Sequence, residues 1–386
     1  MMDDREAMQM AIACARTVEG RTSPRPPVGA VVIRDGVIIG QGATSPPYGS
    51  HAEVYALHQA GSAAHGADLY VTLEPCCVTT HTPRCTDAII EAGIRRAIVG
   101  VSDPNPLVCG RGIDQLRAAG IEVAMGIEAQ ETQELIRPFA TFITKGRPYV
   151  TAKWAMTLDG KLATYTGDAY WISGPSARVW VHNLRDRVDA ILIGSGAARI
   201  DNPLLTVRLA PEQRTYQRLP RQGPLRVVLA SRRLLPNHLS LLQPDDTSRT
   251  CLIVGENYDR ELYLPLQERG VDVIQVALDT QGRVDFGSAL DALGQRGIMH
   301  VLLEGGAQLL GSAFDQSLID HVAVFIAPKL VGGSGAPSPM QGHGLALMKD
   351  ALHLKNMCSQ LIGEDTLIEG EIDSKENTRP IWGSML

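Results

Sequence analysis

Apolar residues in the first 145 positions alternate between helical spacing and short strand-like runs. The segment REAMQMAIACARTV (5–18) has apolar residues at helical spacing, which predicts a helix. VGAVVIRDGVIIGQG (28–42) predicts two strands joined by an Asp-Gly turn. SHAEVYALHQAG (50–61) predicts a helix with Ser50 as its N-cap and a glycine at its end.

The remainder of this region continues the alternation of strands and helices. We predict strands at 67–74 and 95–103, a helix at 82–93, and a helix followed by a strand within 110–126. Strands that alternate with helices are typical of an α/β domain, and we place the end of this domain near residue 145.

A second set of elements begins at KGRPYVTAKWAM (145–156), which reads as a boundary followed by an opening strand. Apolar runs interleaved with helical segments then recur at 181–196, 225–231, 250–255, 271–276, 300–306 and 321–333. We therefore predict domains at 1–145 and 146–373. The last stretch, 374–386, has no periodicity, and we interpret it as a mobile tail.

Composition narrows the class of protein. The chain has 386 residues, is 44% hydrophobic and 20% charged, and carries a net charge of −6, which fits two globular domains and argues against a nucleic-acid polymer as partner. The acidic start MMDDREAMQM is unlike a signal peptide, and we find no apolar run near the ~18 residues of a membrane span. Seven cysteines at irregular spacing favour a reducing, cytoplasmic location over a disulfide framework.

Three of those cysteines fall within LYVTLEPCCVTTHTPRC (69–85). Cys76 and Cys85, together with His51, make a set of one imidazole and two thiolates, which is typical of a catalytic zinc site with a fourth position for water. Glu53 lies two residues after His51 and can serve as the proton shuttle, as in the zinc deaminases. The competing interpretation makes the cysteines buried thiols and His51 a helix cap. Cys77 is interpreted as a small packing residue.

This combination of residue types suits hydrolytic deamination. Zinc lowers the pKa of bound water from about 15.7 to about 7, so that hydroxide is present at neutral pH and can attack an amidine-like ring carbon. A carboxylate must then carry protons to the ring nitrogen and to the departing amine, and Glu53 is placed for that role.

Several motifs along the chain resemble those of a known family. The motifs HAEVYAL, YVTLEPC, TPRCTDAI, DPNPLVCGRG, TLDGKLAT, WISGPSAR, DNPLLTVR, LLEGGAQLLGSAF and IAPKLVGG stand in the order found in the bifunctional riboflavin-biosynthesis deaminase/reductases, over residues 5–370. The resemblance implies an α/β chain with an N-terminal cytidine-deaminase-like domain and a C-terminal dihydrofolate-reductase-like domain. It also implies Zn²⁺ and NADPH as cofactors, and deamination of a phosphoribosylamino-diaminopyrimidinone followed by reduction of its ribose to a ribityl chain.

The resemblance also assigns individual residues. It makes His51, Cys76 and Cys85 the zinc ligands and Glu53 the shuttle. In the second domain it implies contacts with NADPH at Ala155, Trp171, Ala197, Asp201, Ser231 and Gly306. It implies contacts with the substrate at Ala169, Arg185, Leu205, Arg208 and Glu304.

Without the family resemblance, the sequence of the second domain indicates little about its chemistry. HVLLEGGAQLLGSAF predicts a strand, a Gly-Gly turn and a helix whose N-terminus can hold cofactor phosphates, although such a turn is often only a turn. Arg185 and Arg208 could grip a substrate phosphate, or be solvated surface residues. Asp201 could be a turn residue and Trp171 a core residue.

The sequence departs from the family at several positions near the expected sites. Val78, Thr80 and His81 replace the usual His, Gly and cation, and Arg25 stands where Asn is usual between two prolines. Ala169 and Ala197 stand where a Ser and a Thr are usual. One interpretation is a refitted but active pocket, in which new cations such as Arg25 replace lost phosphate contacts. The other is a paralogue with a retuned or silent deaminase half.

Two further classes of function remain open from the sequence alone. A tRNA deaminase would share the His-Ala-Glu and Pro-Cys elements, but it would need a basic or aromatic platform that the acidic balance does not favour. A binding or regulatory protein would hold little zinc. By resemblance we expect a homo-oligomer formed through the reductase domain, a small-molecule pyrimidine substrate, and neither nucleic acid nor membrane as partner.

Overall fold

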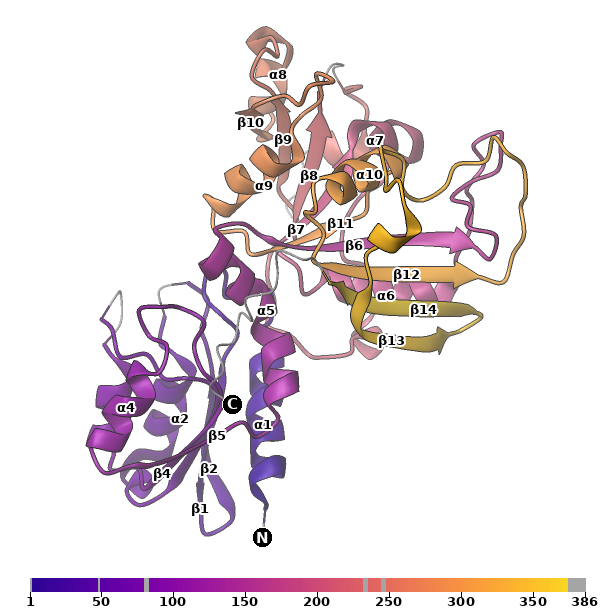
Figure 1. The fold of residues 1–386 in the computed structure, drawn as a ribbon. Coiled ribbons are helices and arrows are strands. Elements are labelled where there is room, and N and C mark those ends of the chain that lie inside the picture. Colours follow the sequence, from indigo (N-terminus) through magenta and orange to yellow (C-terminus); the bar gives the residue numbers. More distant parts are fainter. Residues whose placement is uncertain (1, 48, 80–82, 232–234, 244–247, 374–386) are drawn as a thin grey trace. The chain divides into compact units, whose positions relative to one another are not determined.

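The computed structural model describes residues 2–47, 49–79, 83–231, 235–243 and 248–373 (Figure 1). The chain forms two compact units, and each is built on a sheet of its own. Among the described residues, unit 1 comprises 2–146 and 216–221, and unit 2 comprises 147–215 and 222–373. In the described part of the chain no helix combines the length and the apolar character needed to cross a membrane.

Unit 1 is built on a five-stranded sheet in the order β2-β1-β3-β4-β5. The first three of these strands pair antiparallel, whereas β3, β4 and β5 run parallel. The hairpin turns at Asp35 and Gly36, whose φ angles of 52° and 77° suit an Asp-Gly turn. The strands span Gly29–Arg34 (β1), Val37–Ala43 (β2), Asp68–Leu73 (β3), Arg96–Val101 (β4) and Glu122–Met125 (β5).

Apolar side chains of unit 1 form two buried clusters on the sheet. In β1, Val31 and Ile33 pack with helix α1, while Ala30 and Val32 point the other way and pack with helix α2. This two-sided burial explains why β1 reads as a continuous apolar run. The helices of the unit are α1 (Asp4–Arg16), α2 (Ala52–Ala60), α3 (Cys85–Glu91), α4 (Arg111–Ala118) and α5 (Ala129–Lys145).

Two glycines of β2 set the position of α2. A Cβ atom at Gly40 would lie 2.1 Å from the carbonyl oxygen of Ala56, and one at Gly42 would lie 2.4 Å from that of Ala52. Only glycine therefore allows the strand and the helix to approach so closely. The approach places the first turn of α2 against the sheet.

Unit 2 contains a nine-stranded sheet in the order β10-β9-β8-β7-β11-β6-β12-β14-β13. The strands from β10 to β12 in this order are parallel, and β14 and β13 add an antiparallel edge. The strands are β6 (Tyr149–Thr157), β7 (Ala190–Gly194), β8 (Leu225–Ala230), β9 (Thr250–Gly255), β10 (Asp272–Val276), β11 (His300–Leu303), β12 (His321–Ala327), β13 (Leu354–Ile362) and β14 (Asp365–Ile372).

Buried side chains of alternate strand positions in unit 2 fall into separate clusters. In β7, Ala190 and Leu192 belong to one cluster and Ile191 and Ile193 to another, as expected for a sheet buried on both faces. The helices are α6 (Pro175–Arg185), α7 (Ser195–Asp201), α8 (Leu264–Gln267), α9 (Phe286–Gly294) and α10 (Ala307–Asp315).

The predicted mixed α/β architecture is confirmed, with some corrections. The N-cap of α2 is His51 and not Ser50, so the candidate ligand itself occupies the cap position. The helix at 129–145 and the hairpin at 354–372 were not predicted. The predicted mobile tail at 374–386 lies outside the described residues.

Candidate functional site

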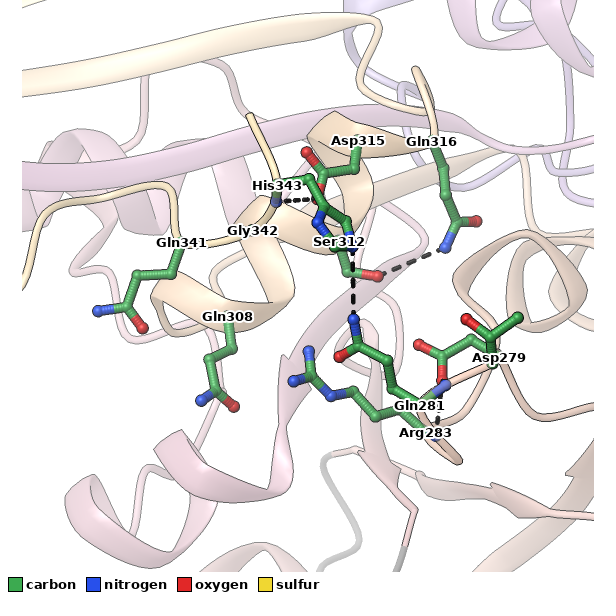
Figure 2. A pocket seen from close by; sticks show the side chains of 11 residues that line it. Asp279, Gln281, Arg283, Gln308, Ser312, Asp315, Gln316, Gln341, Gly342 and His343 are labelled. Atoms are coloured by element: carbon green, nitrogen blue, oxygen red, sulfur yellow. Dashed lines mark hydrogen bonds between the residues drawn. The ribbon is translucent and has the colours of Figure 1, made fainter. Parts of the chain in front are cut away.

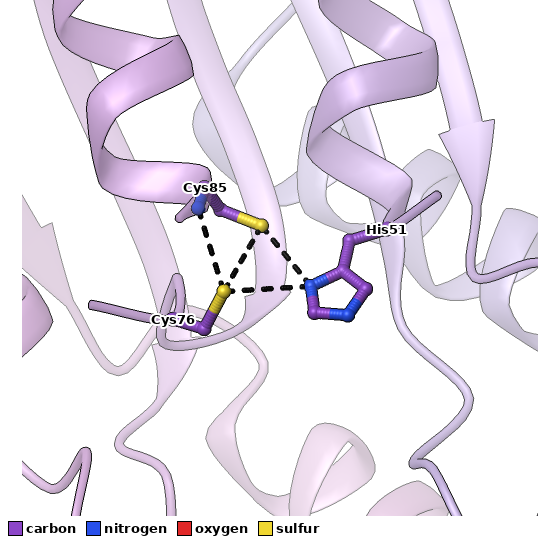
Figure 3. Close-up of side chains that lie close together, drawn as sticks. All are labelled: His51, Cys76 and Cys85. Carbon is purple, nitrogen blue, oxygen red and sulfur yellow. Dashed lines mark hydrogen bonds between the residues drawn. The ribbon is translucent and has the colours of Figure 1, made fainter. Parts of the chain in front are cut away.

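Three elements of unit 1 bring His51, Cys76 and Cys85 together (Figure 3). His51 is the N-cap of α2, and Cys85 is the first residue of α3. Cys76 follows β3, which ends at Leu73. The loop after β3 is held against α3, because the amide of Thr86 donates to the carbonyl of Cys76 at 3.2 Å.

The ligand atoms of these three residues face one another. His51 Nδ1 lies 3.1 Å from Cys85 Sγ and 3.5 Å from Cys76 Sγ, and the two sulfur atoms are 3.3 Å apart (Figure 3). One imidazole and two thiols converging in this way fit a tetrahedral zinc ion, with a fourth position left for a small ligand. Cys77 is not part of this group among the described residues.

Proton sharing links the three groups. The hydrogen bond between the two sulfur atoms, followed by the interaction with His51, lowers the pKa of Cys76 to about 4 against the effect of burial. The same hydrogen bond, together with burial, raises the pKa of Cys85. These opposite shifts make Cys76 the more readily deprotonated of the two thiols, and the thiolate is the form that binds metal.

Glu53 stands in the first turn of α2 and is 3% exposed. Burial raises the pKa of its carboxyl group, while the nearby His51 opposes that change. A carboxyl group sequestered from water beside the ligand cluster is suited to hold and release a proton.

A second buried glutamate, Glu74, supports the cluster and was not predicted. Its carboxylate accepts backbone N–H bonds from Asp103, Gly110 and Gly112 at 2.9–3.0 Å, and a longer one from Ile113. Glu74, which lies two residues before Cys76 in the sequence, thus caps the N-terminus of α4. Its signal was the glutamate in LEPC, which directly follows an apolar strand.

We predict that Glu74→Gln lowers the free energy of unfolding of unit 1 by about 1.5–3 kcal/mol. The side-chain NH₂ group of glutamine would face backbone N–H groups that now donate to a carboxylate oxygen, and those donors would lose their acceptor. Circular dichroism during urea unfolding measures the change. The matched control is Glu91→Gln at the exposed end of α3, expected to change stability by less than about 0.5 kcal/mol. Equal stability of the two variants would contradict the role given to Glu74.

In unit 2, many of the expected cofactor and substrate residues follow neighbouring parallel strands. Ala197 and Asp201 lie in α7, which starts directly after β7, and Ser231 directly follows β8. Glu304 follows β11, and Gly306 is the N-cap of α10. Because β8, β7, β11 and β6 are adjacent, these residues share one edge of the sheet, where α/β proteins bind ligands.

Glu304 and Arg185 form a buried ion pair at this edge. The guanidinium donates from Nε at 2.6 Å and from Nη2 at 2.8 Å to the two carboxylate oxygens, and the side chains are 12% and 11% exposed. Lys153 of β6 lies nearby, and burial lowers the pKa of its ammonium group while Glu304 opposes that change. Lys153 was not predicted, although a lone charge in the apolar strand VTAKWAM was a usable signal.

His182 joins the expected substrate residues Arg185, Leu205 and Arg208. Its Nδ1 accepts the backbone N–H of Arg208 at 3.3 Å, and Leu205 is buried with φ of 51°. Burial, followed by the charges of Arg185 and Arg208, lowers the pKa of His182 to about 4. The ring is therefore neutral at neutral pH and can accept this bond.

The pKa of His182 predicts a loss of stability in acid. The unfolded chain takes up a proton near the ordinary value of 6.5, and the folded chain only near 4, so the stabilisation is present above 6.5 and is lost as pH falls toward 4. Between pH 7 and pH 5 this costs about 2 kcal/mol of unfolding free energy, which His182→Asn should remove. Urea unfolding followed by tryptophan fluorescence measures it, and an unchanged pH dependence in the variant would refute it.

The structure places two other predicted residues on an exposed loop and a third in strand β6. Trp171 is 54% exposed, with the guanidinium of Arg178 4.4 Å from its ring centre, so it is not a core residue. Ala169 is exposed on the same loop, and Ala155 is half-buried in β6. Thr80 and His81 lie outside the described residues.

Unit 2 also has a polar cavity of about 390 Å³ beside α10 (Figure 2). Gln308 and Ser312 of α10 line it together with Asp315, whose carboxylate accepts backbone N–H bonds from His343 and Gly344 at 2.8 and 3.0 Å. None of the individually predicted cofactor or substrate residues lines this cavity.

The fold, the site and the family matches together define a two-part enzyme, in which a deaminase domain with a zinc-binding region is followed by a reductase domain. Residues 1–101 match the family described as "Cytidine and deoxycytidylate deaminase zinc-binding region", and residues 148–368 match the "RibD C-terminal domain". The chain belongs to the RibD family of bifunctional deaminase/reductases of riboflavin biosynthesis.

Relatives and solved structures match nearly the whole chain. The riboflavin biosynthesis protein RibD of Aquifex aeolicus is 39% identical over 95% of this chain and 97% of its own length, and that of Synechocystis is 40% identical over 96% of each. The Thermotoga maritima deaminase/reductase structure has a TM-score of 0.80 at 34% identity, covering 95% of this chain and 98% of its own. Acinetobacter baumannii RibD, form 1, has a TM-score of 0.81 at 32% identity, covering 96% and 99%. These matches confirm the cytidine-deaminase-like and dihydrofolate-reductase-like domains and give no support to a paralogue with a retuned or silent deaminase half.

Proposed function

We propose that a domain at 1–145 removes the amino group of a phosphoribosylamino-diaminopyrimidinone and that a domain at 146–373 reduces the ribose of the product with NADPH. The observation that carries the first half is the convergence of His51, Cys76 and Cys85 beside buried Glu53. We place the reactions in the cytoplasm, in a homo-oligomer that binds neither nucleic acid nor membrane.

In the deaminase half, His51, Cys76 and Cys85 would hold zinc through Nδ1 and two sulfur atoms. The metal, when bound, makes a water molecule acidic near neutral pH. Glu53 would accept a proton from the attacking water and pass it to the ring nitrogen. It would then take the remaining proton of the added hydroxyl group and donate it to the amine, which leaves as ammonia while the carbonyl forms.

In the reductase half, reduction must add hydride to the ribose carbon bonded to nitrogen and a proton to the ring oxygen that leaves that carbon. NADPH supplies the hydride. Lys153, a half-buried residue beside Glu304, is the acid we propose for the proton, because the lowered pKa of its ammonium group makes proton release easier. Arg208 would bind the substrate phosphate, and Arg185 would orient Glu304.

The decisive experiment supplies zinc-loaded protein with the phosphoribosyl diaminopyrimidinone and follows ammonia release and NADPH oxidation together. We expect ammonia first and NADPH consumption after it. If NADPH is consumed only when deaminated substrate is supplied, the deaminase half has lost this substrate, and the changes at Arg25 and Val78 become the explanation. If neither signal appears with either substrate, the proposal is wrong.

A further inference from the structure

The guanidinium group of Arg25 is committed to one loop of unit 1. Nη1 donates to the carbonyl of Gly49 at 2.8 Å, and Nη2 donates to the carbonyls of Ser45 and Pro46 at 3.0 and 2.7 Å. This loop joins β2 to α2 and leads directly into His51. Arg25 therefore holds both ends of the segment that precedes a candidate zinc ligand.

These bonds leave Arg25 poorly suited to bind a phosphate. A guanidinium grips an anion through two parallel N–H groups, and both of its bidentate edges include Nη2. Here Nη2 already donates to two carbonyl oxygens. The Nε atom is buried without a hydrogen-bond partner in the described part of the chain, so no bidentate edge is available.

Further hydrogen bonds make the connection from Arg25 to His51 stiff. The turn that carries Arg25 is closed by its amide, which donates to the carbonyl of Thr22 at 2.9 Å, and by the Thr22 hydroxyl, which donates back at 2.8 Å. On the loop side, the amide and hydroxyl of Ser45 donate to the carbonyl of Ser50 at 3.2 and 3.0 Å. Ser50 is bonded directly to His51.

We propose that Arg25 is a positioning residue that fixes the loop between β2 and α2, and through it the imidazole of His51, instead of a cation that binds the substrate phosphate. The inference rests on the proposed zinc deaminase. It also means that the position where the family usually has Asn makes backbone contacts in this chain and does not face the substrate. Recognition of the pyrimidine must then depend on other residues.

The test uses full-length, zinc-loaded Arg25→Gln and Arg25→Lys proteins. Arg34→Gln is the matched control, because Arg34 is exposed at the end of β1 and donates to one carbonyl, that of Ala63. Zinc transfer to a chromogenic chelator is timed. Ammonia release is measured with the phosphorylated substrate and with its dephosphorylated form. NADPH oxidation on deaminated substrate checks that unit 2 of each variant is intact, and circular dichroism during urea unfolding checks that unit 1 is folded.

A positioning role predicts about tenfold faster zinc transfer for Arg25→Gln and a smaller change for Arg25→Lys, which keeps a donor to the loop. It also predicts that kcat/KM falls by the same factor for both substrates, while Arg34→Gln is unchanged. Unchanged zinc transfer, together with a loss confined to the phosphorylated substrate, would overturn the proposal and restore Arg25 as a phosphate ligand. If the unaltered protein releases no ammonia, the proposed function fails, yet the zinc-transfer comparison still decides the role of Arg25.

Discussion

Glu53→Gln should reduce ammonia release by about 10²–10⁴-fold, the contribution expected of a positioned general acid–base group. The amide keeps the size of the side chain in its buried place at the start of α2 but cannot take up the proton. Steady-state assays of the zinc-loaded protein measure the loss. Zinc content should be unaltered, since Glu53 is not one of the three converging ligands.

Two observations separate catalysis from damage to the fold in that variant. The rate of NADPH oxidation on deaminated substrate should match that of the unaltered protein, because the residues expected to carry out the reduction lie in unit 2 and Glu53 lies in unit 1. Glu91→Gln, at an exposed position of unit 1, should retain full ammonia release. Ammonia release by Glu53→Gln within a factor of ten of the original rate would remove Glu53 from the mechanism.

Arg185→Ala should destabilise unit 2 by about 3–5 kcal/mol, because it leaves the buried carboxylate of Glu304 without its bidentate partner. The ammonium of Lys153 offsets part of this cost, since it already interacts with Glu304. Reductase activity should be lost along with the stability. Urea unfolding followed by fluorescence measures the change, because Trp154, Trp171 and Trp180 all lie in unit 2.

The control for this variant is an arginine–carboxylate ion pair at the surface. Arg249 lies 2.5 Å from Asp272, but its side chain is 65% exposed, so Arg249→Ala should cost less than about 1 kcal/mol. Ammonia release should survive in both variants. A loss of less than about 1 kcal/mol in Arg185→Ala would mean that the buried pair is not needed for stability.

The sequence alone could predict the elements whose patterns are local. The hairpin at 28–42 and the strand, Gly-Gly turn and helix at 300–315 carry strong short-range signals, and both are present. The hairpin at 354–372 was missed because β13 is exposed along most of its length and lacks the alternation of a half-buried strand. The cap of α2 was misassigned because serine is usually the better N-cap, whereas here the following histidine takes that place.

The candidate sites divide in the same way. His51, Glu53, Cys76 and Cys85 could be found because metal ligands of these types have a recognisable spacing. The glutamate in LEPC stands out after an apolar strand, but the roles of Glu74 and Arg25 could not be predicted, because both act on backbone groups of distant segments that the sequence does not identify. One interpretation of the sequence had Arg25 replace a lost phosphate contact on the basis of its charge, and its three carbonyl partners argue against that role.

The close approach of α2 to β2 at Gly40 and Gly42 has a consequence for enzyme engineering. The backbones of β2 and α2 are in direct contact there. No side chains lie between them that could rearrange and let the helix that carries Glu53 move relative to the strand. Substrate range could then diverge through the loops that surround the centre while the reacting groups keep their places. A library aimed at new pyrimidines should randomise those loops and leave both glycines untouched.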